Sequence, residues 1–180
     1  HLMDTVSIDF FTVPTINFRL LYGFVVLHHH RRCVLHFNVT QHPTAQWTGQ
    51  QVVEAFPFVD PPRFLLRDND GIYGEEFRSR VRSLGIDEVK TAKHSLWQNP
   101  YAERIIGSIR RECLDHVIVL SEAHLKRILR SYFTYYHEAR THLSLNRNAP
   151  VRRDVEPASM GAVVSQPMVG GLHHRYTRAA

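Results

Sequence analysis

The sequence has little cysteine, few lysines and no long apolar run. Its two cysteines, Cys33 and Cys113, lie in apolar settings and lack the CxxC spacing of zinc and redox sites. We expect both to be free thiols in a reducing compartment. The 180 residues contain no run of 18 apolar residues and no signal peptide. We therefore expect a cytoplasmic protein that has no membrane partner.

The scarcity of lysine leaves arginine as the main source of positive charge. Of the 22 basic residues only three are lysine, and the formal net charge is +5 with a pI of about 9.5. A basic chain of this kind favours a polyanionic partner, and the arginine fork suits bidentate phosphate contacts better than lysine does. An arginine-rich chain can also result from a GC-rich genome, so composition leaves this question open.

Hydrophobic periodicity predicts one α/β domain. Period-two alternation and short apolar runs predict strands at residues 5–13, 18–28, 32–40, 63–68 and 86–90. Helical spacing predicts helices at residues 45–56, 74–84, 99–115 and 121–137, with Asn99 as a candidate cap. This order indicates a five-stranded mixed sheet flanked by helices, whose first three strands form an antiparallel meander. We expect a mobile loop at 91–98, a domain over 1–150 and an irregular basic tail over 151–180.

Three acidic residues stand in unusual contexts. Asp9 lies inside an apolar strand, Asp68 ends another, and Glu103 occupies the first turn of a helix. An acid in or at the tip of a buried strand is costly unless positive charge meets it. Three carboxylates that converge at strand and helix ends would suit Mg²⁺, which prefers oxygen ligands. Taken singly, Asp9 could instead pair with an arginine. Glu103 could be present only because the helix dipole stabilises an acidic residue in the first turn.

Basic and histidine-rich segments each allow two interpretations. Arg104, Arg110 and Arg111 share a helix with Glu103 and could contact DNA phosphates or form a solvated face. The histidines at 28–30 and 173–174 have no partners at zinc spacing, which favours solvated positions over a zinc site.

Five short strings follow one another along the chain: residues 7–11 (SIDFF), 66–74 (LRDNDGIYG), 99–104 (NPYAER), 110–114 (RRECL) and 135–142 (YYHEARTH). In this order they resemble the catalytic core of DDE-type, retroviral-integrase-like transposases of bacterial insertion sequences. The resemblance covers roughly residues 5–150 and implies the ribonuclease H-like fold. Each string alone is weak, but their order along the chain, with suitable elements between them, is specific.

The resemblance implies that Asp9, Asp68 and Glu103 are the catalytic residues and the metal ligands. They would bind Mg²⁺ or Mn²⁺, as two ions. Asp70 is a rival for the second position, because 70–71 (DG) also resembles the turn of the family. Aligning Tyr73 with the aromatic residue that follows this turn in related transposases favours Asp68.

The resemblance also implies a DNA transposase or integrase that cleaves and joins DNA strands in integration and recombination. Its partners would be the element ends and the target DNA, and the chain would form at least a dimer in the bacterial nucleoid. Residues 1–3 (HLM) resemble the start of a fragment, and we expect a sequence-reading helix-turn-helix module upstream. The alternatives are a ribonuclease H-like nuclease or an inactive DNA-binding fragment. The tail could be disordered, grip DNA or dock on a second subunit.

Overall fold

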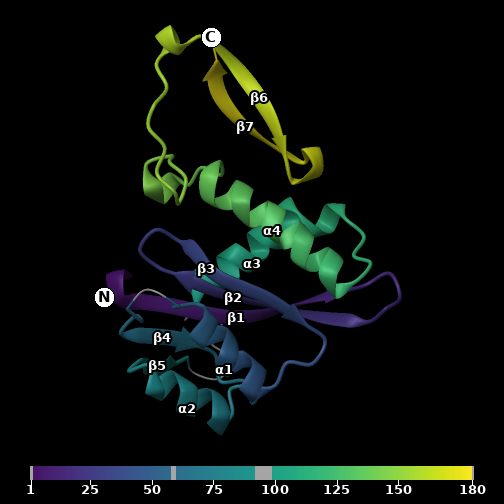
Figure 1. Cartoon of the computed structure of the whole chain (residues 1–180), viewed down its shortest axis with the longest axis vertical. Coiled ribbons are helices and arrows are strands. Elements are labelled where there is room, and N and C mark those ends of the chain that lie inside the picture. Colours follow the sequence, from purple (N-terminus) through teal and green to yellow (C-terminus); the bar gives the residue numbers. More distant parts are fainter. Residues whose placement is uncertain (1, 58–59, 92–98, 180) are drawn as a thin grey trace.

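A five-stranded mixed sheet forms the centre of the molecule (Figure 1). The computed structural model describes residues 2–57, 60–91 and 99–179. The strands lie in the order β3-β2-β1-β4-β5; the first three are antiparallel, and β4 and β5 run parallel to β1. The predicted sheet is therefore confirmed. Its strands are β1 (Thr5–Pro14), β2 (Leu20–His28), β3 (Cys33–Thr40), β4 (Phe64–Arg67) and β5 (Asp87–Lys90).

Four helices cover the two faces of this sheet, as predicted. The helix expected at 99–115 ends earlier, and a short 3-10 turn at Leu114–His116 follows it. The mobile loop predicted at 91–98 lies outside the described residues, apart from Thr91. None of the described helices is long and apolar enough to cross a membrane. The helices are α1 (Ala45–Glu54), α2 (Glu75–Ser83), α3 (Pro100–Glu112) and α4 (Glu122–Glu138).

Alternation along the central strands builds two separate cores. In β2, Val25 and Leu27 face α3 and α4, whereas Phe24 and Val26 face α1 and α2. Successive side chains of a strand point to opposite faces, so a central strand buried on both sides reads as a continuous apolar run. The sheet is therefore the middle layer of three (Figure 1).

Side chains at the N-terminal ends of the helices determine where each helix begins. Thr44 caps α1 by accepting a hydrogen bond from the Trp47 amide, and Ser121 caps α4 in the same way. Asn99 occupies the N-cap position of α3, as predicted, but its side chain makes no capping hydrogen bond. Its side-chain amide instead donates to the Ile8 carbonyl at 3.3 Å. The start of α3 is thereby tied to β1 beside Asp9.

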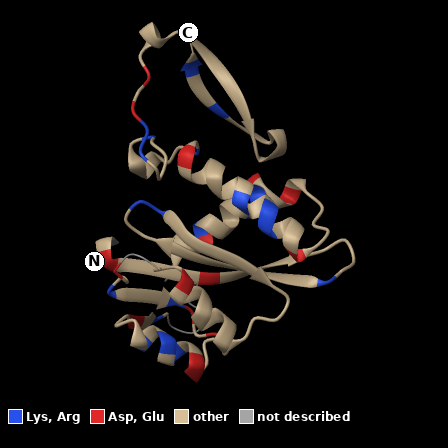
Figure 2. Cartoon of the chain, viewed as in Figure 1, with Lys and Arg blue, Asp and Glu red and all other residues tan. Residues whose placement is uncertain are grey.

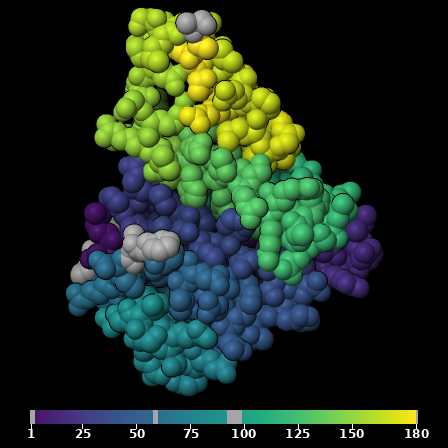
Figure 3. All heavy atoms as spheres, viewed as in Figure 1, coloured from purple at the N-terminus to yellow at the C-terminus, as the bar shows by residue number. Residues whose placement is uncertain are grey.

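The segment after α4 contains a two-stranded hairpin, β6 (Ala162–Met168) with β7 (His173–Ala179). The prediction of an irregular tail was wrong here, while the domain boundary at residue 150 stays a prediction. Most of the hairpin's side chains are exposed on both faces, so its sequence lacks the alternation that marks a half-buried strand. Figure 3 shows the segment standing over α4, on the opposite side of the sheet from α1 and α2.

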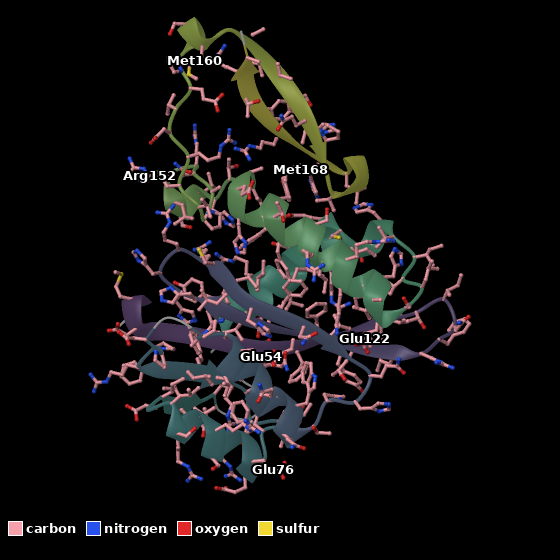
Figure 4. The ribbon with its side chains drawn as sticks, viewed as in Figure 1. Glu54, Glu76, Glu122, Arg152, Met160 and Met168 are labelled. Atoms are coloured by element: carbon pink, nitrogen blue, oxygen red, sulfur yellow. The ribbon has the colours of Figure 1, made fainter. Side chains whose placement is uncertain are left out.

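Ring stacking, a hydrogen bond, an ion pair and apolar packing hold this hairpin to the helices. The rings of Tyr135 and His173 stack with centroids 4.1 Å apart, and the His173 Nε2 is 2.7 Å from the Glu112 carbonyl. Arg175 forms an ion pair with Glu138 at 2.9 Å. Figure 4 labels Met168 at the base of the hairpin next to α4, where it packs against the core. The described part of the tail is thus docked on the domain.

Candidate active site

A hollow of about 570 Å³ brings the three predicted acids together. Asp9, Asp68 and Glu103 all line it, from β1, the end of β4 and the first turn of α3. Ser7 pairs with Leu66 in the parallel ladder of β1 and β4, so each aspartate follows its paired residue by two positions. The parallel register therefore carries both aspartates to the same end of the sheet, and the Asn99 contact brings α3 to it.

Burial and neighbouring negative charges disfavour the ionised forms of Asp9 and Asp68. Burial, together with the charges of Asp68 and Glu103, raises the pKa of Asp9 to about 7 against the lowering effect of the Phe10 amide. Burial also raises the pKa of Asp68, opposed by a hydrogen bond from the Asp70 amide. Carboxyl groups with raised pKa values in one cleft mark a candidate functional site.

The donor set of the hollow fits a hard divalent cation. All of its candidate ligands are carboxylate oxygens, which Mg²⁺ and Mn²⁺ prefer. A cation placed there would remove the repulsion that raises the pKa of Asp9. Among the described residues, no three His, Cys, Asp or Glu side chains are grouped so that they could hold an ion.

Asp70, the rival of Asp68, also lines the hollow but is exposed. Its carboxylate accepts a hydrogen bond from the Ile72 amide at 3.0 Å, which closes the turn after β4. The carboxylates whose charges raise the pKa of Asp9 are those of Asp68 and Glu103. Electrostatic coupling therefore favours Asp68 as the partner of Asp9.

Sequence reasoning missed Arg67, whose side chain is only 2% exposed. Its Nε and Nη2 contact the Glu88 carboxylate at 2.8 and 2.7 Å, and its Nη1 donates to the Asp68 carbonyl at 2.8 Å. The guanidinium carbon lies 4.9 Å from the centre of the Tyr73 ring. Arg67 thus fixes the backbone of Asp68 at the end of β4. The sequence feature that could have indicated this ion pair is an arginine inside an apolar strand followed by an acidic residue on the next strand.

The structure separates the three arginines predicted to bind DNA. Arg110 lines the hollow with the acids and donates to the Thr12 carbonyl at 3.1 Å. Arg104 lines a different pocket, beside Tyr101 and Arg140. Arg111 is exposed and folds back over Gly107. Their arrangement places Arg110 alone of the three beside the acids.

His29 departs from the solvated turn expected at 28–30. It is buried, its Nε2 hydrogen-bonds the hydroxyl of buried Ser7, and its ring lies 4.6 Å from that of Tyr101. Burial lowers the pKa of His29 to about 4, so the ring is neutral at physiological pH. This histidine therefore helps to pack the start of α3 against β1.

The raised pKa of Asp9 predicts how stability depends on pH without divalent metal. Between pH 4 and 7 the folded chain keeps a proton that the unfolded chain has released, so this group's contribution to stability is lost as pH rises. Asp9→Asn removes the charge. In EDTA we expect the variant to melt a few degrees above the wild type at pH 8 and at nearly the same temperature at pH 4. An equal difference at both pH values in thermal melts would contradict this assignment.

Comparisons with known proteins agree with this architecture. Residues 84–150 match the integrase core domain family. No curated protein gave a significant sequence match. Among solved structures, a chain of the simian T-cell lymphotropic virus intasome is similar with a TM-score of 0.64 and 15% identity, covering 97% of this chain and 66% of its own length.

Two catalytic domains show the same likeness. The HTLV-2 integrase catalytic core domain, solved with magnesium, has a TM-score of 0.63 and 12% identity over 83% of this chain and 94% of its own. The catalytic domain of the Mos1 mariner transposase has a TM-score of 0.62 and 16% identity over 74% of this chain and 71% of its own. The chain therefore has the predicted ribonuclease H-like fold, which it shares with these integrase and transposase catalytic domains.

Proposed function

We propose that this chain is the catalytic domain of a DDE-type transposase or integrase that cleaves and joins DNA strands. The observation that carries the proposal is the gathering of Asp9, Asp68 and Glu103 in one hollow at the strand ends of an integrase-like fold. A polynucleotidyl transferase needs such an acidic cluster where a phosphodiester can approach. The basic chain, with a net charge of +5, suits this substrate.

Asp9, Asp68 and Glu103 would hold Mg²⁺ or Mn²⁺, as two ions. The HTLV-2 core was solved with magnesium, and the Mos1 catalytic domain was solved with Mg and with Mn. Bound divalent ions would supply the positive charge that activates the attacking oxygen and stabilises the leaving one. Their positive charge would lower the raised pKa of Asp9, because a nearby cation favours the ionised carboxylate.

The chain's own residues would place the substrate for two in-line displacements. In cleavage, a water oxygen bonds to phosphorus, the bond to the 3′-oxygen breaks, and the proton ends on the leaving 3′-hydroxyl. In joining, that 3′-hydroxyl attacks a phosphodiester of the target in the same way. Arg110, beside the acids, would donate to a phosphate oxygen. Arg67 would hold the Asp68 backbone still.

The partners follow from this reaction. They would be the element ends, the target DNA and a second copy of the chain, since the HTLV-2 core was solved in dimeric and trimeric forms. We propose that residues 1–150 form the catalytic domain and that 151–180 form a basic C-terminal tail. The site of action would be the bacterial nucleoid.

A strand-transfer assay tests the proposal. The chain is incubated in Mg²⁺ or Mn²⁺ with a labelled pre-cut element end and a target duplex, and with a blunt end to detect cleavage. We expect joined products that are longer than either substrate. Cleavage without joining would identify a nuclease of the same fold. DNA binding without either product would identify an inactive fragment.

A further inference from the structure

We propose that a second site binds a DNA phosphodiester strand, in a groove between β3, α4 and the C-terminal segment. This inference rests on the proposed function and adds a contact surface outside the acidic hollow. The groove has a volume of about 550 Å³ and shares no lining residue with that hollow. We call it the arginine groove, after Arg130, Arg152, Arg153 and Arg175, which line it.

Charge distinguishes this groove. Its four arginines face one acid, Glu138, which Arg175 engages at 2.9 Å. Arg153 is also engaged, because its guanidinium lies 3.5 Å from the Glu156 carboxylate. In the ranges that the structure describes, the guanidinium groups of Arg130 and Arg152 have no hydrogen-bond or ion-pair partner. The groove therefore keeps an excess of positive charge.

A buried donor in the groove points to a missing acceptor. The Nε of Arg175 is buried, and no acceptor reaches it from the described part of the chain. A buried donor without a partner costs about 1–3 kcal/mol, and more when it is charged. An anionic oxygen in the groove would satisfy this donor once the partly exposed Arg175 side chain turns toward it. Arg130 and Arg152 are exposed and can approach the same ligand from α4 and from the segment after it.

Arginine chemistry and the shape of the groove favour a phosphodiester strand. Planar guanidinium forks match phosphate oxygens bidentately, and the groove contains no lysine. Its floor is apolar, formed by Val34 and Phe37 of the edge strand β3 and Phe133 of α4, against which sugars and base edges can pack. Figure 2 shows basic segments in blue on α4, on the segment after it and on β7, and Figure 4 labels Arg152.

This placement gives strand transfer a second hold on DNA. The reaction joins two DNA segments, and the acidic hollow can take one reacting phosphodiester at a time. The C-terminal segment contributes Arg152, Arg153 and Arg175 to the groove, so its docking by the Tyr135–His173 stack also builds the binding surface. The hairpin thereby acquires a role in binding DNA.

Binding measurements on the chain test this site. The variant carries Arg130→Gln and Arg152→Gln, both at exposed positions, so its melting temperature should be unchanged. The control, Arg127→Gln with Arg82→Gln, removes the same charge outside the groove. Affinity for a labelled DNA single strand and duplex is measured by anisotropy in EDTA at several salt concentrations. We expect the groove variant to lose roughly tenfold in affinity per contact near 0.1 M salt, with the salt slope lower by about one per contact.

The control should change little by comparison. Equal losses in the groove variant and the control would overturn the proposal. A polyglutamate peptide of matched charge that competes as well as DNA would also overturn it, in favour of an acidic protein partner. Because EDTA removes divalent metal, this result is independent of strand transfer. A loss confined to the groove variant would uphold the site even if the chain joined no DNA.

Discussion

Replacing Asp9 by Asn is expected to abolish DNA cleavage and joining, with a loss of about 10³-fold or more. The substitution keeps the shape of the side chain and removes one charge from the metal-binding set. Metal charge stabilisation contributes several kcal/mol to such transition states, and each 1.36 kcal/mol corresponds to a factor of ten in rate. We expect the same loss for Asp68→Asn and Glu103→Gln. The measurement is the yield of cleaved and joined DNA with time in Mg²⁺.

Matched variants make this test specific. Asp87→Asn removes an exposed acid from β5, outside the hollow, and should leave activity intact. Millimolar Mg²⁺ should raise the melting temperature of the wild type, because a ligand of the native state stabilises it, and should fail to do so in Asp9→Asn. An active Glu103→Gln protein would refute the assignment. Loss of activity in Asp70→Asn, with Asp68→Asn active, would make Asp70 the second ligand.

The sequence was informative wherever local pattern determines structure. Strand alternation located β1 to β5 and helical spacing located α1 to α4, because each core is built from residues that repeat at these periods. The order of strands and helices and the resemblance then placed Asp9, Asp68 and Glu103 together. The three acids converge because β1 pairs in parallel with β4 and because α3 begins beside β1. Neither feature can be predicted from local sequence patterns, and only the family resemblance indicated them.

Features that depend on a distant partner escaped prediction. The buried state of Arg67 requires Glu88 on the neighbouring strand, and that of His29 requires Ser7 and Tyr101. No local period encodes such pairs. The hairpin β6–β7 escaped for another reason: it is exposed on both faces, so its strands carry no hydrophobic signal.

Two strings of the resemblance have a structural explanation. Glu112 receives the Arg140 guanidinium at 2.8 and 2.6 Å and the Tyr132 hydroxyl at 2.8 Å. The hydrogen bonds from Arg140 and Tyr132, against the effect of burial, hold the pKa of Glu112 below its usual range. These hydrogen bonds join the last residue of α3 to the middle of α4 and to the residues that follow α4. Residues of the strings 110–114 and 135–142 therefore hold α3, which carries Glu103, against α4.

A substitution at Arg67 should cost a large share of the stability of the fold. Arg67→Met keeps an apolar stem and leaves the Glu88 carboxylate, whose side chain is 12% exposed, without its partner. Removing one member of a buried ion pair costs about 3–5 kcal/mol, a large share of the 5–15 kcal/mol that stabilises a typical domain. We expect this decrease in the free energy of unfolding measured by urea denaturation.

A second substitution separates the ion pair from the position of Asp68. The double variant Arg67→Met with Glu88→Leu removes both charges of this pair, so most of the lost stability should return. The hydrogen bond from Arg67 to the Asp68 carbonyl is still absent, so strand transfer should stay below the wild-type rate. Arg82→Met breaks an exposed pair with Glu75 and should change stability by no more than about 0.5 kcal/mol. A double variant with wild-type activity would show that Arg67 contributes only to stability. The turn after β4 would then suffice to position Asp68.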